Sequence, residues 1–367
     1  MRPLFRGPRE GRTQAPDSTR ELLTLTLIPG LSARVIAQLA ERAPLAEVLA
    51  HPDDHADLVP EAGLAELRTG RAAFRAEKER AEAARLGISV IALGDPLYPA
   101  LLRRIFDPPP VLYVRGTLVA EELAVAVVGS RAASTAGKAL ARGMARDLAA
   151  WGATVVSGLA RGIDTAAHEG ALDAPGGRTV AVLGCGIDRT YPPENERLAG
   201  RVTGAGAVVS EFALGTPPLP DHFPRRNRVI AGWSQAVVVV EAAARSGALN
   251  TARCAADEGR DVLAVPGHPT MAGSAGTNQL IRDGAGLVRS ALDVAQELGI
   301  EPPAEAPPPA DRLLAALGGD APLTLEELCT RSGLETGALL ARLTELELRD
   351  VVRRLPGPMF VRHHHAR

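Results

Sequence analysis

The sequence predicts an α/β protein with a Rossmann-like, doubly wound and mostly parallel sheet, flanked by an N-terminal small helical domain and a C-terminal winged-helix domain. Six apolar runs without strict alternation predict strands that are buried on both faces, as in a parallel sheet. Ala-rich helical stretches separate these runs, and strands that alternate with helices indicate right-handed crossovers within one sheet. We expect the strands at residues 123–128, 154–157, 179–183, 207–210, 236–240 and 262–265. We expect the helices between them at residues 138–151, 164–172, 193–202 and 249–259.

The segment before the sheet divides into an arm and a helical region. Residues 1–20 are rich in Arg, Pro, Gly and polar residues, which predicts a disordered basic arm. The helical pattern at 21–90 predicts a small domain of the SAM or helix-hairpin-helix type, ahead of a Rossmann-like domain at 110–298. Its Ile-Pro-Gly-Leu sequence at 28–31 resembles a hairpin turn whose glycine lets backbone N–H groups approach a phosphate. An ordinary turn between two helices explains these residues as well.

The segment after the sheet begins with a Pro-rich run at 299–310, which predicts a stiff extended linker. Three short helices and a β-wing then predict a winged-helix domain at 311–363, with the elements at 311–317, 324–332, 335–348 and 351–361. The third helix of such a domain usually reads DNA. Here that helix carries acidic residues, among them Glu345 and Glu347, which would repel phosphates. A protein-binding or purely structural role therefore competes with DNA binding.

Composition limits the possible partners and the compartment. The formal net charge of −2 gives no global basic field, but a local arginine cluster suffices for phosphate binding. Only Lys78 and Lys138 are lysines, so phosphate contacts would be planar and bidentate. The three cysteines are too far apart to suggest a metal site or a disulfide framework. With neither a signal peptide nor an apolar run of membrane-spanning length, we expect a cytoplasmic protein with no membrane contact, metal or cofactor.

The first candidate site follows the first predicted strand of the sheet. In open parallel sheets ligands bind beyond the carboxyl ends of the strands, and here these positions hold Gly129, Ser130, Arg131 and Ser134. The glycine allows close approach of an anion, while the hydroxyls, the guanidinium and the N-terminus of the following helix would bind it. A plain turn capped by a hydroxyl side chain is the alternative.

Two further segments add glycines and arginines to this edge. Gly158 and Arg161 follow the second strand, and the run Phe-Pro-Arg-Arg-Asn-Arg at 223–228 is the strongest basic element. Arginine pairs with phosphate oxygens, and a phenylalanine offers a face on which a base can stack. The alternative for this run is a solvated turn with Phe223 in the core. The G-x-G-x-x-G spacing of a dinucleotide site is absent from the turn after the first strand.

Together these motifs resemble the DprA (Smf) family of DNA-processing proteins of natural transformation. They occur in order over about residues 120–290, as Val-Gly-Ser-Arg (128–131), Ser-Gly-Leu-Ala-Arg-Gly-Ile-Asp (157–164), Ala-Val-Leu-Gly-Cys-Gly-Ile-Asp (181–188), Phe-Pro-Arg-Arg-Asn-Arg (223–228), Glu-Ala-Ala-Ala-Arg-Ser-Gly (241–247), Pro-Gly (266–267) and Gly-Thr-Asn-Gln-Leu-Ile (276–281). The resemblance implies a protein that binds and protects incoming single-stranded DNA and loads the RecA recombinase onto it, without being an enzyme. It also implies a homodimer that involves the segment after Asn278.

The expected DNA-binding residues combine the motifs with the residue chemistry. The resemblance implies a pocket of Gly129, Ser130, Arg131, Gly158, Phe223, Arg226, Asn227 and Arg228, to which the basic and hydroxyl residues nearby add Ser134, Arg161 and Arg225. For the dimer interface we expect Asn278, Leu280, Ile281 and Leu287, because the last three supply apolar surface after a Gly-rich loop.

Two other functions use the same edge of the sheet. A nucleotide-processing hydrolase would need a base or nucleophile, for which the candidates are Asp164, Glu211, Glu241 and His268. These residues are scattered and also read as caps or turn residues, and no Walker lysine follows a Gly-rich loop. A sensor that binds a small nucleotide is the third possibility. A lone helical His168 reads as structural.

Overall fold

The structure of this chain is a computed structural model that describes residues 18–302, 309–318, 321–349 and 351–362. Within it the chain divides into two compact units, Met1–Glu301 and Pro302–Arg367. Most of the expected arm at 1–20, the centre of the expected linker at 299–310 and the last residue of the 311–363 domain lie outside the described residues. Of the arm, Thr19 and Arg20 belong to the first helix.

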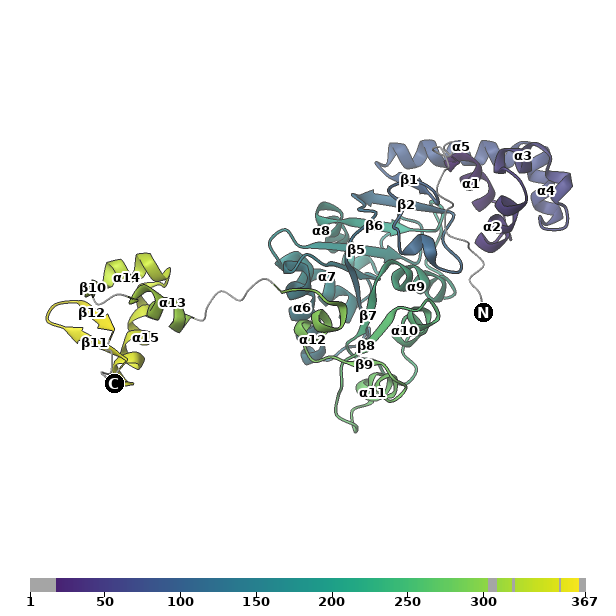
Figure 1. The fold of residues 1–367 in the computed structure, drawn as a ribbon. Coiled ribbons are helices and arrows are strands. Elements are labelled where there is room, and N and C mark those ends of the chain that lie inside the picture. The colour runs from purple at the N-terminus through teal and green to yellow at the C-terminus, as the bar shows by residue number, and fades with distance from the viewer. Residues whose placement is uncertain (1–17, 303–308, 319–320, 350, 363–367) are drawn as a thin grey trace. The chain divides into compact units, whose positions relative to one another are not determined.

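A nine-stranded sheet forms the centre of the first unit, in the order β1-β2-β6-β5-β4-β3-β7-β8-β9 (Figure 1). The strands are β1 (Ser89–Ala92), β2 (Val111–Gly116), β3 (Ala124–Val128), β4 (Thr154–Ser157), β5 (Arg178–Leu183), β6 (Ala207–Ser210), β7 (Ala236–Val239), β8 (Asp261–Ala264) and β9 (Gly286–Leu287). The pairs from β6 through β3 to β9 are all parallel, so the prediction of a doubly wound, mostly parallel sheet is confirmed. The antiparallel strands β1 and β2 were not predicted, because prolines dominate the sequence between them.

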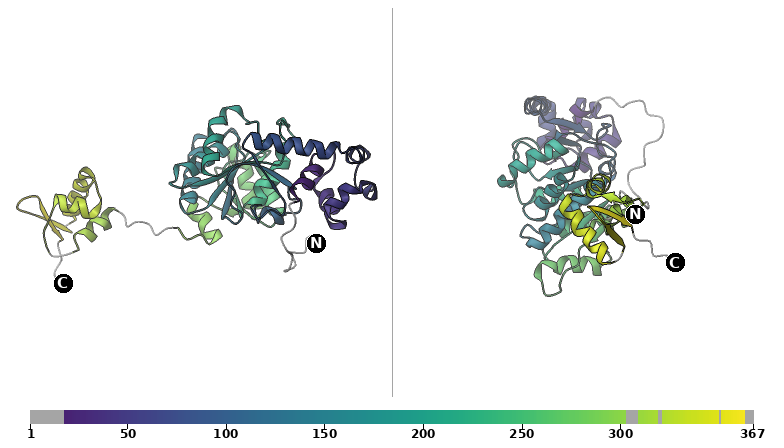
Figure 2. Two further views of the ribbon diagram at one scale, coloured as in Figure 1. Left: turned by 90° about the horizontal axis from the view of Figure 1, so that it is seen from above. Right: turned by 90° about the vertical axis from the view of Figure 1, so that its left-hand side faces the viewer.

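Helices cover both faces of the sheet, as Figure 2 shows from above. Alternate residues of β3 enter two different core clusters: Ala126 lies against α9 and α10, and Val127 against α6, α7 and α12. This burial on both sides explains why the strands lack polar alternation. The helices of this part are α6 (Thr135–Ala150), α7 (Ile163–Asp173), α8 (Glu196–Ala205), α9 (His222–Trp233), α10 (Ala248–Asp257), α11 (Ala275–Arg282) and α12 (Ala291–Leu298), with short 3₁₀ turns η2 (Leu102–Arg104), η3 (Pro193–Asn195) and η4 (Ala272–Ser274).

The N-terminal helices share a hydrophobic cluster with the sheet, so this region and the sheet form one compact unit. They are α1 (Thr19–Thr26), α2 (Ala33–Arg42), α3 (Leu45–Ala50), α4 (Glu61–Arg68) and α5 (Arg71–Arg85), with a 3₁₀ turn η1 (Pro52–His55). Tyr113 of β2 is fully buried, and its hydroxyl donates to Glu79 of α5 at 3.0 Å. Between α1 and α2, Gly30 has a φ of 80°, in the left-handed region that glycine adopts readily.

The second unit is a winged-helix domain, which confirms that prediction. Its helices are α13 (Pro309–Ala316), α14 (Leu325–Ser332) and α15 (Thr336–Leu348), and its strands are β10 (Leu323–Thr324), β11 (Val352–Leu355) and β12 (Met359–Arg362) in the order β10-β12-β11. Leu328, Leu343 and Phe360 belong to its core. On α15, Glu345 pairs with Arg342 and with Arg349, which offsets part of the negative charge expected on that helix.

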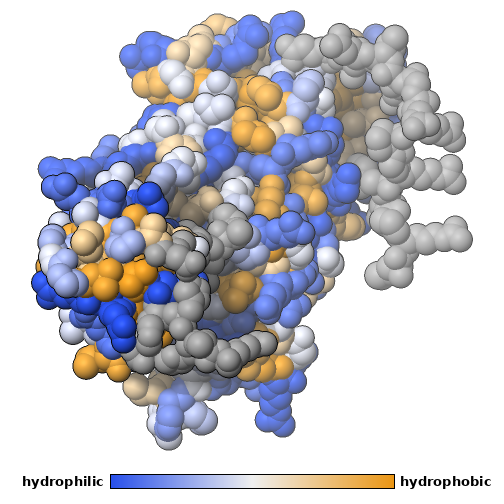
Figure 3. Space-filling model, turned by 60° about the vertical axis from the view of Figure 1, so that its left-hand side comes forward, coloured by the Kyte–Doolittle hydropathy of each residue, from blue (hydrophilic) through white to orange (hydrophobic). Residues whose placement is uncertain are grey.

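The surface carries no sign of a membrane segment in the described part of the chain. None of the described helices is both long and apolar enough to cross a membrane. On the face drawn in Figure 3, hydrophobic residues form small patches between hydrophilic ones. Scattered apolar residues of this kind are normal on a folded protein.

The shared core of the N-terminal helices and the sheet predicts how the chain tolerates truncation. A fragment of residues 18–301 should keep the thermal midpoint that this unit has in the full chain, because no core cluster crosses position 301. A fragment that begins at 110 removes β1 and uncovers Tyr113 and its neighbours, so its midpoint should fall. Differential scanning calorimetry of the two fragments and the full chain checks this. Equal midpoints for both fragments would contradict the shared core.

Candidate nucleic-acid interface

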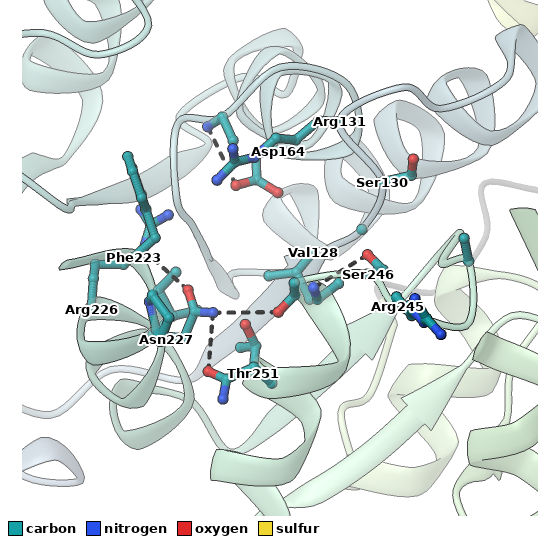
Figure 4. A pocket seen from close by; sticks show the side chains of 18 of the residues that line it. Val128, Ser130, Arg131, Asp164, Phe223, Arg226, Asn227, Arg245, Ser246 and Thr251 are labelled. Carbon is teal, nitrogen blue, oxygen red and sulfur yellow. Dashed lines mark hydrogen bonds between the residues drawn. The ribbon is translucent and has the colours of Figure 1, made fainter. Parts of the chain in front are cut away.

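A pocket of about 530 Å³ opens beyond the carboxyl ends of the central parallel strands (Figure 4). From β3 the chain runs through β4 and β5 to β6 on one side, and through β7 and β8 to β9 on the other. The loops that follow β3 and β7 therefore diverge and leave a crevice, which is where open α/β sheets bind their ligands. Its volume lies in the range of ordinary ligand pockets.

The structure brings six of the expected DNA-binding residues together in this pocket, namely Gly129, Ser130, Arg131, Phe223, Arg226 and Asn227. Gly158 and Arg161 line a shallow hollow beside it, together with Tyr191. Three other expected residues, Ser134, Arg225 and Arg228, line neither of these cavities. Arg225 and Arg228 point away from the pocket because of their positions around helix α9, and Ser134 is bound to Glu241.

The basic run 223–228 lies on helix α9 rather than in a loop, so its side chains point in different directions. Arg225 and Arg228 are three residues apart and share one face of the helix. There they donate to Oε2 of Glu211, at 3.1 Å and 2.5 Å, and the Glu211 side chain is only 2% exposed. These two guanidinium groups neutralise a buried carboxylate instead of facing the pocket, so the expectation that they contact DNA finds no support in their positions.

Arg226 lies on the other face of α9 and is buried, with 4% of its surface exposed. Its Nη1 donates to the carbonyl oxygen of Gly158 at 2.7 Å and to that of Val182. Burial lowers the pKa of Arg226 to about 10. A Cβ on Gly158 would stand 2.5 Å from this Nη1, so glycine is needed here to admit the arginine. The requirement for Gly158 is thus packing, whereas the sequence had suggested phosphate approach.

The carboxylate of Asp164 holds the loop after β4 in its conformation through hydrogen bonds to the backbone. Its Oδ2 accepts the backbone N–H groups of Gly158 and Ala160 at 3.1 Å and 3.3 Å, and burial raises the pKa of this carboxyl. Between them Leu159 has a φ of 57°, a left-handed conformation that costs a non-glycine residue on the order of 1–3 kcal/mol.

His168 lies one helical turn after Asp164 on α7 and is buried. Its Nδ1 lies 2.7 Å from Thr179 Oγ1, and burial lowers the pKa of His168 to about 3. His168 lines neither cavity and therefore belongs to the core.

The N-terminus of helix α6 is occupied by a carboxylate of the chain itself. Oε2 of Glu241 accepts the Ser134 hydroxyl at 2.8 Å and the Ser134 backbone N–H at 3.1 Å. Ser134 Oγ in turn accepts the N–H of Gly137 at 2.9 Å and caps the helix. A negative group is stabilising at this position, and it takes the place that the sequence had suggested for a phosphate. The loop at 129–132 and the loop that carries Arg245 line the pocket and remain for an external anion.

The free positive charges of the pocket are Arg131 and Arg245, from the loops after β3 and β7 (Figure 4). Both side chains are exposed, and neither forms a hydrogen bond or ion pair with any residue that the structure describes. The Arg131 guanidinium carbon lies 5.1 Å from the centroid of the Phe223 ring. Sequence reasoning missed Arg245, although it follows a strand within a small-residue loop, as Arg131 does.

Polar side chains of helix α10 complete the floor of the pocket. Nδ2 of Asn227 lies 3.3 Å from Asn250 Oδ1 and 3.4 Å from the carbonyl oxygen of Gly247. Thr251 lines the same wall. Amide and hydroxyl groups at this position suit the edges of a base or a sugar. The sequence of α10 showed only its helical pattern, so Asn250 and Thr251 were missed.

Of the four residues proposed as catalytic, Asp164 lines the pocket but is bound to the backbone N–H groups of Gly158 and Ala160, and the other three are engaged elsewhere or lie apart. Glu211 and Glu241 are bound as described, and His268 is exposed, with its Nδ1 2.8 Å from Thr270 Oγ1. Among the residues that the structure describes, no cluster of three or more His, Cys, Asp and Glu could hold a metal ion.

The expected dimer residues are partly tied to their own chain. Asn278 donates to the carbonyl oxygen of Gly267 at 2.9 Å and accepts its N–H at 3.1 Å. Leu280 packs against the core. Ile281 is half-buried, and Leu287 on the edge strand β9 is 48% exposed. Ile281 and Leu287 thus remain available for contact with another molecule.

Comparison with known proteins gives matches over both units. A family model described as DNA recombination-mediator protein A matches residues 89–299, and one described as DprA winged helix domain matches residues 301–358. Protein Smf of Escherichia coli (strain K12) is 41% identical over 277 residues, covering 71% of this chain and 74% of that protein. DNA processing protein DprA of Streptococcus pneumoniae is 45% identical over 208 residues, covering 55% of this chain and 72% of that protein.

Two solved structures are similar as well. The X-ray structure of DNA processing protein A from Streptococcus pneumoniae has a TM-score of 0.66 at 36% identity and covers 76% of this chain and 97% of that chain. A structure from Helicobacter pylori, described for the single-stranded DNA binding mode of DNA processing protein A, has a TM-score of 0.52 at 28% identity. It covers 57% of this chain and 95% of that chain. The first family match includes every residue of the pocket.

The burial of Arg226 predicts a large effect on stability. Replacing Arg226 with Met leaves the carbonyl groups of Gly158 and Val182 without their donor, which should lower the free energy of unfolding by about 1–3 kcal/mol. The matched control is Arg225→Met on the exposed side of the same helix, where the loss should stay below about 1 kcal/mol. Urea denaturation followed by circular dichroism measures both. Equal losses would show that Arg226 has no special structural role.

Proposed function

This chain belongs to the DNA recombination-mediator protein A family, and from that premise we propose that it binds single-stranded DNA in the pocket beyond β3 and β7. One observation carries the proposal: two exposed guanidinium groups, Arg131 and Arg245, flank a pocket that also presents the ring of Phe223, and neither has a hydrogen-bond or ion-pair partner in the described chain. A positive groove beside an aromatic face is the usual arrangement for binding a single strand. The Helicobacter pylori relative, described for binding single-stranded DNA, supports the proposal.

In the proposed complex a phosphate lies at the loop 129–132, close to Arg131. The planar guanidinium can make two parallel hydrogen bonds to the phosphate oxygens, and its contact with Phe223 holds it near the site in advance. A base then stacks on Phe223, while Arg245 meets the backbone from the opposite rim. The pocket has a single acidic side chain in its lining, Asp164, and that carboxyl is buried.

We further propose that the protein protects the strand and loads the RecA recombinase onto it, as a cytoplasmic DNA-binding protein rather than an enzyme. Glu211 and Glu241 are engaged in ion pairs and caps, and Oδ2 of Asp164 accepts two backbone N–H groups, which supports a binding role for the pocket rather than a catalytic one. A homodimer formed through Asn278, Leu280, Ile281 and Leu287 would place two pockets on one strand. Two linked sites increase the apparent affinity without any new contact.

Arg131 should be the most costly pocket residue to remove. A charge-assisted contact to phosphate is worth about 1.5–3 kcal/mol, so Arg131→Ala should weaken single-strand binding roughly ten- to a hundredfold. The slope of log affinity against log salt should flatten by about one phosphate. Arg131→Lys should recover only part, because an ammonium makes no planar two-point contact. Fluorescence anisotropy with labelled oligothymidylate over a salt series measures all of these.

The matched control for Arg131 is Arg225→Ala, which removes an exposed charge outside the pocket and should leave affinity within about twofold. If Arg131→Ala binds like the parent chain with the same salt slope, the loop 129–132 is not the phosphate site. If the parent chain binds mononucleotides but not single strands, the function is that of a nucleotide sensor.

The proposed dimer interface can be tested by substitution of Ile281, which is apolar and half-buried. Ile281→Glu places a charge in the proposed interface and should give folded monomers, because an isologous contact repeats the penalty on both sides. The control Val119→Glu changes an exposed apolar residue before β3 and should leave the assembly state unchanged. Multi-angle light scattering distinguishes the two. A folded Ile281→Glu dimer would refute this interface.

A further inference from the structure

Tyr191 is an exposed aromatic residue beside the pocket that the proposed contacts do not use. The chain has three tyrosines, all of them described by the structure, and Tyr98 and Tyr113 are fully buried. Tyr191 is 41% exposed, and its hydroxyl has no hydrogen-bond partner among the described residues. In a chain with only 3% aromatic residues, an exposed tyrosine at the edge of a ligand pocket calls for a physical explanation.

The tyrosine continues the aromatic surface of the pocket. Its ring centroid lies 5.7 Å from that of Phe223, with the two planes inclined at 43°. Together with Arg161 these rings line the shallow hollow, which shares Arg131 and Arg226 with the main pocket. The hollow has a volume of about 30 Å³, far below the roughly 300 Å³ at which ordinary ligand pockets begin. A base can therefore lie flat against it but cannot be enclosed by it.

The loop that carries Tyr191 is anchored on both sides. Pro192 is buried, and Asn195 donates to the carbonyl oxygen of Leu159 at 2.8 Å and to Thr165 at 3.0 Å. Upstream, the Asp188 carboxylate accepts the N–H of Gly215 at 2.8 Å. The backbone that carries the ring is thus anchored before any ligand arrives, so little backbone entropy is lost when a base stacks on Tyr191.

Positive charge lies next to the ring. Arg161 pairs with Glu194 but keeps 64% of its side chain exposed. Arg131 also lines the hollow, with its guanidinium carbon 5.1 Å from the centroid of the Phe223 ring. A strand that leaves the main pocket across this hollow would have a guanidinium near its backbone and an aromatic ring under its next base.

We propose that Tyr191 stacks a nucleobase of single-stranded DNA and so forms a second nucleotide subsite beside the Phe223 pocket. This inference rests on the proposed function and deepens it. Bases within a duplex are already paired and stacked, so they cannot offer a free face without being unstacked. The Tyr191 subsite therefore favours single strands over duplexes. The competing explanation is that Tyr191 only packs against Phe223 and keeps that ring in position.

The first experiment compares Tyr191→Ala with Tyr191→Phe in the full chain, using fluorescein-labelled oligothymidylate and a duplex of equal length. Loss of one stacked base should weaken single-strand binding roughly five- to a hundredfold in Tyr191→Ala. Tyr191→Phe keeps the aromatic face and should stay within about twofold of the parent chain. The salt slope should not change in either variant, because no charge is removed. Duplex binding should change by less than single-strand binding.

The second experiment separates stacking from support of Phe223. Oligothymidylate that contains 5-iodouracil is irradiated with the protein, and the cross-linked tryptic peptides are mapped by mass spectrometry. We expect a cross-link in the peptide 190–197, whose one aromatic residue is Tyr191, in the parent chain and in Tyr191→Phe. If cross-links occur only in the peptide 202–225, which contains Phe223, while Tyr191→Ala still loses affinity, Tyr191 is a supporting residue and the subsite is refuted.

The Arg131→Ala variant shows which proposal has failed. If the parent chain does not bind single strands, both the proposed function and the subsite are wrong. If the parent chain binds, Arg131→Ala is weakened and Tyr191→Ala binds like the parent chain, the proposed function stands and the Tyr191 subsite is overturned.

Discussion

The guanidinium of Arg226 lies buried at the carboxyl ends of two central strands, where it donates to the carbonyl oxygens of Gly158 and Val182. A buried charge is tolerated only when such partners surround it, so the two loops must keep their shape around it. This arrangement admits no side chain at Gly158, and the carboxylate of Asp164 fixes the same turn from the other side. The centroid of the Phe223 ring lies 6.0 Å from the guanidinium carbon of Arg226, so the ring is next to these loops. These contacts set the shape of this edge of the pocket before any ligand binds.

The arginines in and around the pocket have different roles, which depend on how deeply each side chain is buried. Arg225 and Arg228 offset the buried charge of Glu211, and Arg226 holds the loops together. Arg131 and Arg245 remain for an external anion. A chain with a net charge of −2 can thus present a local positive pocket, because Arg131 and Arg245 have no carboxylate partner there among the described residues. Counting arginines in a motif overestimates the number that face a ligand.

Glu241 links the two loops of the pocket to the segment that leads to the proposed dimer interface. It stands directly beyond β7, binds Ser134 at the start of α6, and packs against Gly273 before α11. A Cβ on Gly273 would stand 2.8 Å from Oε1 of Glu241, so a larger residue at this position would require the Glu241 side chain to shift. Glu241 therefore contacts both the start of α6 and the segment that precedes α11.

The amino-acid sequence by itself determined the parallel sheet, the winged helix and the edge of the sheet that carries the pocket, because aliphatic runs, helical periodicity and Gly-Arg turns are local signals. It also indicated Arg131 and Phe223, which face the pocket in the structure. Only the tertiary structure decided that Arg228 turns away, that Glu241 fills the α6 N-terminus, and that Tyr191 lies beside Phe223. These outcomes depend on the phase of a helix and on partners far away in the chain. No local pattern records which side chain a distant carboxylate or ring will meet.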